Sequence, residues 1–546
     1  MKTSPTDRSL RSRSVGGPGR TESLVGAPRL LRLALRRDRV LLPVWVAALV
    51  LGSVSSVQAT VDLYPDAASR VEAAAAVNDN PAVVAIYGPL ADVNSVGSLA
   101  TFKLLLLGGV FVAMVCSVLV RRHTRLEEES GRAELLASTV VGRHALLAAA
   151  VTEAVLAAVL TGLLTALGNT AAGLDAPGSL AFGLAWTGLG LAAAGVTALC
   201  CQLTASTRTA GGLVALVLGA GYVLRAVGDL SAGWLSWLSP FGWATQLRAY
   251  GDERWWVLAL PVLVAAATLA GAVALAERRD VGAGLVPDRP GPARGSLGSV
   301  TALTLRLHRG STLAWGLGIL VLGAVMGGIA PGVADIAGSA EVQDMLRRTG
   351  GGGALVDAFL ATEVSFLAVA VTAFAVAAVV RASGEETEGR TESVLATATS
   401  RSAVLGAVGL VALAGPVVLM LGFGLGASLT YGAQQDGVPA ALGVLLPAAL
   451  APLPAVWLVS GVGMLLFGLR ARWATLGWAV LAGCLLLGQI GELLGLPGWV
   501  VGLSPYGHLP RLPAESFAIG PELGLTAIAA ALLALAVWRY RERDVG

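Results

Sequence analysis

The chain has 546 residues, of which 55% are hydrophobic and only 13% are charged, and its formal net charge is +3. A soluble domain cannot bury that much apolar surface, whereas lipid can cover it, so the composition excludes an ordinary soluble protein. The four cysteines all lie inside apolar stretches, so the sequence indicates neither a disulfide framework nor a thiolate metal site.

The chain begins with a basic tail over residues 1–27, whose Ser, Gly, Pro and Arg content predicts disorder. The segment RLLRLALRRDR (29–39) follows, and LTLRLHRG (303–310) is its counterpart later in the chain. In the first of these, arginines recur at steps of three and four residues, which is typical of a helix lying in the membrane interface. An ordinary basic flank of the next membrane span is the alternative.

Stretches of about 20 apolar residues are needed to cross the hydrocarbon of a bilayer. The sequence contains twelve, near residues 40–59, 98–120, 144–168, 179–204, 209–229, 255–276, 313–333, 363–381, 402–430, 439–468, 474–494 and 521–538. We therefore expect an all-α polytopic membrane protein with twelve transmembrane helices. A Pro- and Gly-rich linker (281–299) separates a first six-helix half (28–280) from a second (300–546).

Arginines gather before the first span, after the second and sixth spans, and after the last one. With twelve spans, all these clusters fall on one side of the membrane. The positive-inside rule assigns that side to the cytosol, so both termini are expected there. The expected location is the cell membrane.

A charged motif occurs twice: EEESGRAELLASTVVGR (127–143) and EETEGRTESVLATATSR (385–401). We call these the first and second cassettes. At an offset of 258, seven positions of each are identical. Glu127, Glu128, Gly131, Arg132 and Glu134 correspond to Glu385, Glu386, Gly389, Arg390 and Glu392, and Thr139 and Arg143 correspond to Thr397 and Arg401.

Both cassettes are predicted to be helical, with each Arg paired to the Glu four residues before it, Glu128–Arg132 and Glu386–Arg390. Such pairs stabilise a helix by only about 0.2–0.5 kcal/mol, which is a weak reason to keep two copies. The cassettes are therefore expected to dock on a cytosolic partner. A solvated hairpin without a partner is the simpler alternative.

The repeat extends to other parts of the chain, at offsets of 270 and 265, and so predicts a duplicated six-helix unit whose two copies share one orientation. One repeated element is a turn on the expected outer side, formed by Ser239, Pro240, Phe241 and Gly242 and again by Ser504, Pro505, Tyr506 and Gly507. Several tryptophans flank the first turn, as is common at the headgroup level. Plain interfacial turns and short outer helices are both possible.

This order of elements resembles the permeases of ATP-binding-cassette (ABC) exporters. The order is an amphipathic helix, two spans, the motif E-E-x-x-G-R-x-E, four more spans, and S-P-[FY]-G before the last. Within that family it is similar to the fused two-half permeases of antibiotic and multidrug export. The resemblance covers residues 28–540 and implies that ten of these cassette residues, the first five named in each cassette, contact the ATPase. It also implies that two copies of a separate cytosolic ATPase drive the export of a small lipophilic substrate through this chain. The surrounding membrane lipid is a further expected partner.

The chain has no P-loop of its own. That motif, Gly-x-x-x-x-Gly-Lys-[Ser/Thr], needs a lysine that binds the phosphates. The only lysines in the sequence are Lys2 and Lys103, and neither stands in such a pattern. ATP and magnesium are therefore expected on the partner, and we expect no cofactor, catalytic residue, metal site or nucleic-acid partner for this chain. The histidines show no metal-binding spacing.

Two alternatives remain open. A proton-driven transporter of the major-facilitator kind also has twelve spans in two halves and would use a buried acid such as Glu153. A lipid or polysaccharide permease of the ABC class would share every motif above. Two Gly-x-x-x-Gly pairs, Gly323/Gly327 and Gly422/Gly426, permit close helix approach and are assigned to packing alone.

Charges inside the membrane are functional candidates. Lys103 in the second span corresponds to a position near Glu363, and Arg225 in the fifth span to one near Glu492. These opposite charges at equivalent positions suggest an outer gate. Snorkelling of each side chain to water is the alternative.

If the gate exists, Lys103→Glu and Glu363→Lys should each impair export, because each leaves two like charges facing one another. The double swap should then restore export. Transport assays of the two single variants and the double variant test this. Additive losses in the double variant, or no loss in either single variant, would favour snorkelling.

Overall fold

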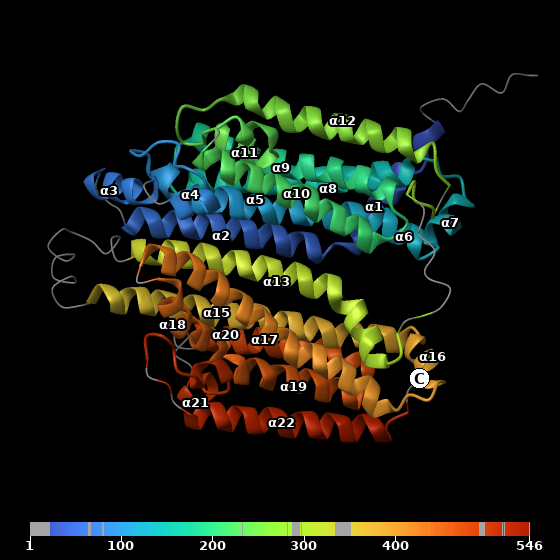
Figure 1. Ribbon diagram of the computed structural model, residues 1–546. Coiled ribbons are helices and arrows are strands. Elements are labelled where there is room, and N and C mark those ends of the chain that lie inside the picture. Colours follow the sequence, from blue (N-terminus) through green and yellow to red (C-terminus); the bar gives the residue numbers. More distant parts are fainter. Residues whose placement is uncertain are drawn as a thin grey trace, which may run out of the picture. The chain divides into compact units, whose positions relative to one another are not determined.

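The computed structural model describes residues 22–544 except for 64–66, 79–80, 232, 281, 287–294, 296, 334–350, 436, 491–496, 516 and 518. The described part is helical and contains no strand. By its internal contacts the chain divides into two compact units, residues 1–290 and 291–546. Figure 1 shows that each unit is a bundle of long helices.

The first unit contains, in chain order, α1 (Ala27–Arg37), α2 (Leu41–Leu63), α3 (Ala67–Asn78), α4 (Pro81–Tyr87), α5 (Val96–His123), α6 (Arg125–Glu129), α7 (Arg132–Ala137), α8 (Ala145–Ala171), α9 (Ala176–Leu203), α10 (Thr207–Leu230), α11 (Pro240–Gln246) and α12 (Ala259–Ala276). Side-chain oxygens cap three of the long helices, Ser95 at α5, Asp175 at α9 and Ser206 at α10. Each satisfies a backbone N–H that the helix itself leaves unpaired.

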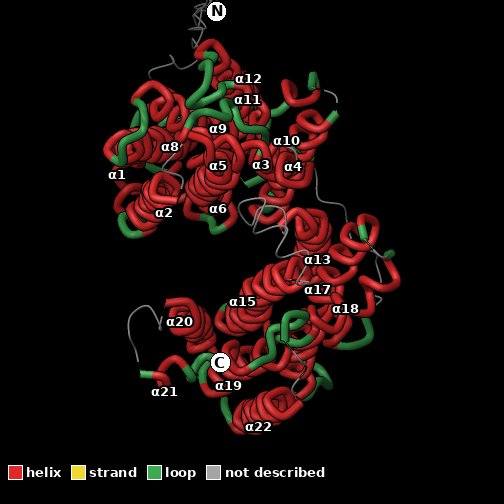
Figure 2. The backbone as a smooth tube through the Cα atoms, turned by 90° about the vertical axis from the view of Figure 1, so that its left-hand side faces the viewer, coloured by secondary structure: helices red, strands yellow, loops and turns green. Residues whose placement is uncertain are grey.

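The core of the first unit is built around α9. Of its most apolar stretch, 78% is buried within the protein, against 17% for α2. Figure 2 looks nearly along the helices and shows α5 and α9 in the middle, with α2, α8, α10 and α12 around them. Small residues permit this packing: a Cβ on Gly162 of α8 would lie 2.3 Å from the carbonyl oxygen of Gly183 in α9.

The second unit contains α13 (Val300–Val333), α15 (Gly351–Thr387), α16 (Arg390–Leu395), α17 (Arg401–Gln434), α18 (Val438–Leu450), α19 (Leu453–Leu469), α20 (Leu476–Ile490), α21 (Gly498–Val501) and α22 (Ile519–Glu542). Its tightest helix pair is α13 with α17. A Cβ added at Gly327 would lie 2.2 Å from the carbonyl oxygen of Ala427, and one at Gly426 would lie 2.1 Å from that of Leu320. The Gly-x-x-x-Gly pairs therefore face each other's helix, and their assignment to packing is confirmed.

Eleven described helices are long and apolar enough to cross a membrane, and a further apolar helix over Ala471–Leu487 is shorter. The described residues therefore confirm a polytopic helical membrane protein but give eleven full-length spans where twelve were expected. The shortfall is the span predicted at 474–494, where α20 has 15 residues and ends at Ile490. The last four residues of that prediction lie outside the described part. The span predicted at 439–468 is divided into α18 and α19 around Pro452.

Two other expectations were wrong in part. The segment 303–310 is not a separate interfacial helix but the beginning of α13, which continues to Val333. In the first unit Asp38 ends α1, whereas the corresponding His308 bonds to Thr304 inside its helix and leaves the helix unbroken. The end of the tail predicted to be disordered is ordered, because the carbonyls of Ser23 and Val25 accept hydrogen bonds from His144 and Gly142. Residues 1–21 of that tail lie outside the described part.

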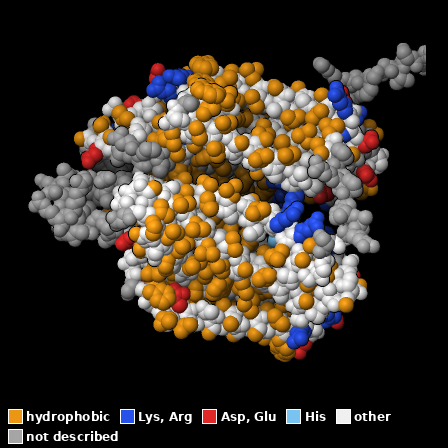
Figure 3. All heavy atoms as spheres, in the orientation of Figure 1, with side chains coloured by type: hydrophobic (Ala, Val, Ile, Leu, Met, Phe, Trp, Pro, Cys, Tyr) orange, Lys and Arg blue, Asp and Glu red, His pale blue; other side chains and the backbone are white. Residues whose placement is uncertain are grey.

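Apolar side chains cover the long sides of the bundles, and charged side chains gather toward the ends of the helices (Figure 3). α6, α7 and the C-terminal end of α12 lie at one end of the first unit, opposite α3, α4 and α11, and α16 lies at one end of the second (Figure 1). We call the end that carries the cassette the cassette end of each unit. The alternation of apolar sides and polar ends is that of helices whose sides face lipid.

Gly327→Leu should destabilise the second unit, because its side chain would overlap the backbone of α17. Overpacking of this kind costs about 1–3 kcal/mol. The matched control is Gly318→Leu in the same helix, where a Cβ meets nothing within 4 Å. Thermal unfolding of both purified variants in detergent is the measurement. Equal unfolding temperatures would contradict the packing assignment.

Candidate functional site

The first cassette is held together by a buried carboxylate. Glu127 accepts hydrogen bonds from Arg132 (Nε–Oε2 2.9 Å and Nη2–Oε1 3.2 Å) and from Arg37 of α1 (Nη1–Oε1 2.7 Å). The bond to Glu127 raises the pKa of Arg132 above its usual value. Glu127 therefore joins α1, α6 and α7, so the position of the cassette depends on the amphipathic helix.

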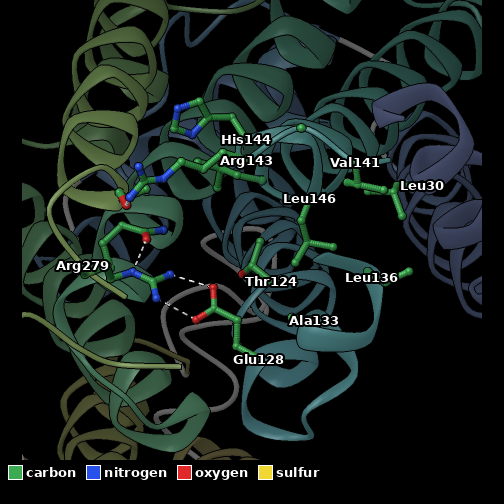
Figure 4. Close-up of a pocket in the computed structure, with 14 residues that line it drawn as sticks. Leu30, Thr124, Glu128, Ala133, Leu136, Val141, Arg143, His144, Leu146 and Arg279 are labelled. Carbon is green, nitrogen blue, oxygen red and sulfur yellow. Dashed lines mark hydrogen bonds and ion pairs between the residues drawn. The ribbon is translucent and has the colours of Figure 1, made fainter. Parts of the chain in front are cut away.

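Glu128 faces a different partner. Arg279, three residues beyond α12, donates to both its oxygens (Nη2–Oε1 2.7 Å and Nη1–Oε2 2.8 Å), and Arg125 also donates to it. Arg279 further bonds to Gln202 at the end of α9 (Nε–Oε1 2.8 Å). Figure 4 shows this two-pronged pair, which ties the cassette to the ends of α9 and α12.

The expected pairing of residues four apart was wrong in both cassettes. Arg132 binds Glu127 and not Glu128, and Arg390 binds Glu385 and Glu388 and not Glu386. The physical reason is the backbone at Gly131 and Gly389, whose φ angles are +74° and +75°.

A residue in the left-handed conformation ends a helix. Arg132 and Arg390 therefore begin the new short helices α7 and α16 after the bend. From there each arginine side chain reaches the glutamate five residues before it, Glu127 or Glu385. A Cβ at either glycine would meet nothing within 4 Å, so the conformation, and not space, favours glycine there.

The second cassette repeats this anchoring with other partners. Glu386 is buried and accepts hydrogen bonds from Arg543 (2.8 Å) and from the hydroxyl of Tyr540 (3.3 Å). Both partners belong to the C-terminal end of α22 or the residues just after it. Arg390 donates hydrogen bonds to Glu385 and Glu388, and these bonds raise the pKa of Arg390 above its usual value. Each cassette is thus fixed to the last long helix of its own unit, at Arg279 in the first and Arg543 in the second.

Other cassette side chains face outward. Glu134 and Glu392 are exposed, and Leu135 is 71% exposed on α7. The residue that corresponds to Leu135 is Ser393, also exposed. The ten predicted residues therefore divide into inward-facing ones that hold the cassette and outward-facing ones that are free to meet a partner. An exposed leucine at one site and a serine at the other make the two surfaces chemically different.

A hollow lies beside each cassette. In the first unit a cavity of about 320 Å³ opens between α1, α7 and the end of α12, with apolar walls from Leu30, Leu136 and Leu146 and polar groups from Glu128 and Arg279 (Figure 4). In the second unit a cavity of about 600 Å³ is bordered by charged residues, Glu386, Glu392, Arg470, Arg472 and Arg543 among them. The same place in the two units thus has different chemistry.

The repeated S-P-[FY]-G turns form short helices at the opposite end of each unit. In the first, Pro240–Gln246 is α11, and Ser239 caps it by accepting from the N–H of Phe241 at 3.1 Å. Gly242 is needed for contact, because a Cβ there would lie 1.8 Å from the carbonyl oxygen of Ser236. The first turn is therefore a packed helix and not a plain turn.

The second turn forms a 3-10 helix over Pro505–His508. Ser504 donates to the carbonyl oxygen of Cys484 at 3.1 Å, and the hydroxyl of Tyr506 lies 2.7 Å from that of Thr372. Gly507 is exposed, and a Cβ there would meet nothing within 4 Å. The second turn thus keeps the proline and the aromatic contact but not the close glycine contact of the first.

Of the four gate candidates, Glu492 lies outside the described residues. Lys103 is exposed near the beginning of α5, with its Nζ 5.6 Å from the centre of the Phe102 ring. Glu363 is half-buried in α15. The pairing of Lys103 with Glu363 stays a prediction.

Arg225 has partners that the sequence analysis missed. It is fully buried, pairs with Asp229 at 3.3 Å and lies over the ring of Tyr222 at 4.5 Å. Its guanidinium also donates to three carbonyls at the end of α4, those of Val84, Ala85 and Ile86. Arg225 therefore caps α4 within the first unit. The sequence did contain a sign of this pairing, because Asp229 stands four residues after Arg225 and so on the same face of its helix.

Comparison with known proteins identifies one family. The family model described as the multidrug efflux system permease Rv1217c, C-terminal domain, matches residues 29–276 and again residues 297–541. The multidrug efflux system permease protein Rv1217c of Mycobacterium tuberculosis (strain ATCC 25618 / H37Rv) is 41% identical over 544 residues. The alignment covers 98% of this chain and 98% of that protein.

Proposed function

The chain belongs to the family of the multidrug efflux system permease Rv1217c, and we propose that it is the membrane permease of an exporter that separate ATPase subunits drive. The order of the cassettes and turns, which resembles that of ABC permeases, favours this proposal over the proton-driven alternative. Under this proposal the cassette end of each unit faces the cytosol, and both termini lie there. The arginines at α1, α5 and α22 support this orientation, because positive charge favours the cytosolic side.

The observation that carries the proposal is the double cassette. Each copy is fixed from inside by a buried carboxylate and presents exposed side chains on a short helix outside. A short helix braced against long membrane helices can transmit a push from a bound partner, because both ends of the ion pairs move together. Two such helices in one chain fit two ATPase copies, one per unit.

We propose that the substrates are small lipophilic molecules. The name of the relative, a multidrug efflux system permease, supports drugs as substrates, and the apolar sides of the bundles (Figure 3) support lipophilic ones. Drug susceptibility of cells with and without the permease and its ATPase, over a panel of lipophilic and hydrophilic compounds, tests this. Protection restricted to lipophilic compounds is the expected outcome, and unchanged susceptibility to all of them would oppose it.

The purified chain should hydrolyse no ATP, because it has no P-loop lysine. Phosphate release by the chain alone and by the chain with its ATPase is the measurement. Turnover that survives removal of every co-purifying ATPase would contradict the proposed division of labour.

Docking should depend on the outward-facing residues. Reversing Glu127 or Glu386 would also break the bonds that hold the cassettes, so exposed positions give a cleaner test. The double change Glu134→Lys with Leu135→Asp should weaken capture of the ATPase about tenfold or more, a loss of ~1.4 kcal/mol. Export should fall, while membrane insertion stays intact.

The control is Asp252→Lys, an exposed charge reversal between α11 and α12, at the end of the first unit opposite its cassette. The measurements are ATPase capture by the purified permease and export from cells. If the double variant and the control capture the ATPase equally well, α7 is not a docking surface. Glu392→Lys then tests α16 in the second unit separately.

A further inference from the structure

Three titratable side chains from separate elements meet beneath the first cassette. Asp38 ends α1, His123 is the last residue of α5, and Glu153 lies in the third turn of α8. The His123 Nε2 atom lies 2.6 Å from Asp38 Oδ2 and 3.3 Å from Glu153 Oε2. One ligand-type atom from each residue falls within 4.8 Å of the other two. All three residues are buried.

The carboxylate of Glu153 lacks the partners that burial requires. Glu153 is 0% exposed, and neither of its oxygens accepts a hydrogen bond in the described structure. A buried carboxylate without hydrogen bonds is costly unless a positive charge lies beside it. Arg122 pairs with Asp38, with Nη1 2.9 Å from Oδ1, the oxygen that His123 does not contact. Among the described residues no arginine or lysine forms an ion pair with Glu153, so the His123 imidazole is the one group that faces both carboxylates.

We propose that Asp38, His123 and Glu153 bind a divalent transition-metal ion, Zn²⁺ being the best match, through Oδ2, Nε2 and Oε2. One imidazole and two carboxylates are a ligand set that this metal accepts, and three protein ligands leave a fourth position for water.

The spacing of His123 and Glu153 agrees with such a centre. Two ligand atoms about 2.0–2.1 Å from a tetrahedral zinc ion are about 3.3 Å apart. The His123–Glu153 separation has this value, and the Asp38–His123 separation would open by about 0.7 Å.

The surroundings fit a metal ligand set as well. Ligand carboxylates commonly have a partner on their second oxygen, and Arg122 forms an ion pair with that oxygen of Asp38, at 2.9 Å. The cluster is particular to the first unit. At the offsets of the internal repeat the second unit has His308, Arg381 and Val411 in these places. There α13 continues unbroken, whereas Asp38 ends α1 in the first unit.

A metal ion bound here would help to fix the position of α1. Asp38 follows Arg37, which binds Glu127 of the first cassette at 2.7 Å. A metal ion would replace one hydrogen bond between α1 and α5 by bonds to α1, α5 and α8 together. It would therefore stiffen the joint between the amphipathic helix and the first cassette. The existence of the site does not depend on the proposed function.

The test uses the full-length chain, purified in detergent with a tag free of histidine, stripped with a chelator and titrated with Zn²⁺. We expect one tightly bound ion per chain by elemental analysis and a higher unfolding temperature with metal. Asp38→Asn, His123→Gln and Glu153→Gln should each weaken binding by about 100-fold or more, beyond the loss expected for an outer-shell partner. The matched control is His144→Gln. That residue lies at the same end of the unit, 3.5 Å from Glu277, and should bind zinc as the wild type does.

Less than one bound ion per wild-type chain overturns the proposal, as does equal zinc binding by the His123→Gln and His144→Gln variants. If the three variants fail to fold, X-ray absorption of the zinc-loaded wild type decides the matter. A first shell of imidazole nitrogen and oxygen at about 2.0–2.2 Å supports the site. A shell that contains sulfur, or that lacks imidazole, overturns it.

Discussion

A carboxylate that is buried at the end of a helix bundle must be matched by positive charge or by hydrogen-bond donors, and this requirement organises the cassette end of both units. Glu127, Glu128 and Glu386 each recruit at least one arginine from another part of the unit. Those arginines stand at helix ends, so every pair joins two elements that would otherwise be free to separate. The shape of the cassette follows from these pairs more than from helix propensity.

The long helices obey a different constraint. In lipid, association between helices depends on close contact and not on the hydrophobic effect, so small residues decide which helices meet. Gly162 and Gly183 bring α8 against α9, and Gly327 and Gly426 bring α13 against α17. These contacts place the ends of the helices, and the helix ends in turn place the arginines that bind the cassettes.

The two units anchor their cassettes with different residues. Arg279 anchors the first cassette and Arg543 the second, each near the end of the last helix in its unit. The hollow beside the first cassette has leucine walls, whereas the one beside the second is bordered by arginines and glutamates. Duplicated sequences that keep a scaffold and change its surfaces can assign different tasks to the two halves. The exposed Leu135 and its counterpart Ser393 are one such change.

By itself the sequence determined the features that depend on local pattern. Runs of apolar residues predicted twelve membrane spans, of which all but one are full-length among the described residues. Identical letters gave the repeated cassettes, and spacing gave the Gly-x-x-x-Gly contacts between α13 and α17. Only the tertiary structure decided which charges pair. Arg132 reaches Glu127 because Gly131 adopts a left-handed conformation, and Arg279 reaches Glu128 across 151 residues of chain. Asp38, His123 and Glu153 meet for the same reason. Their approach depends on how three helices pack, and no periodicity in the sequence records that packing.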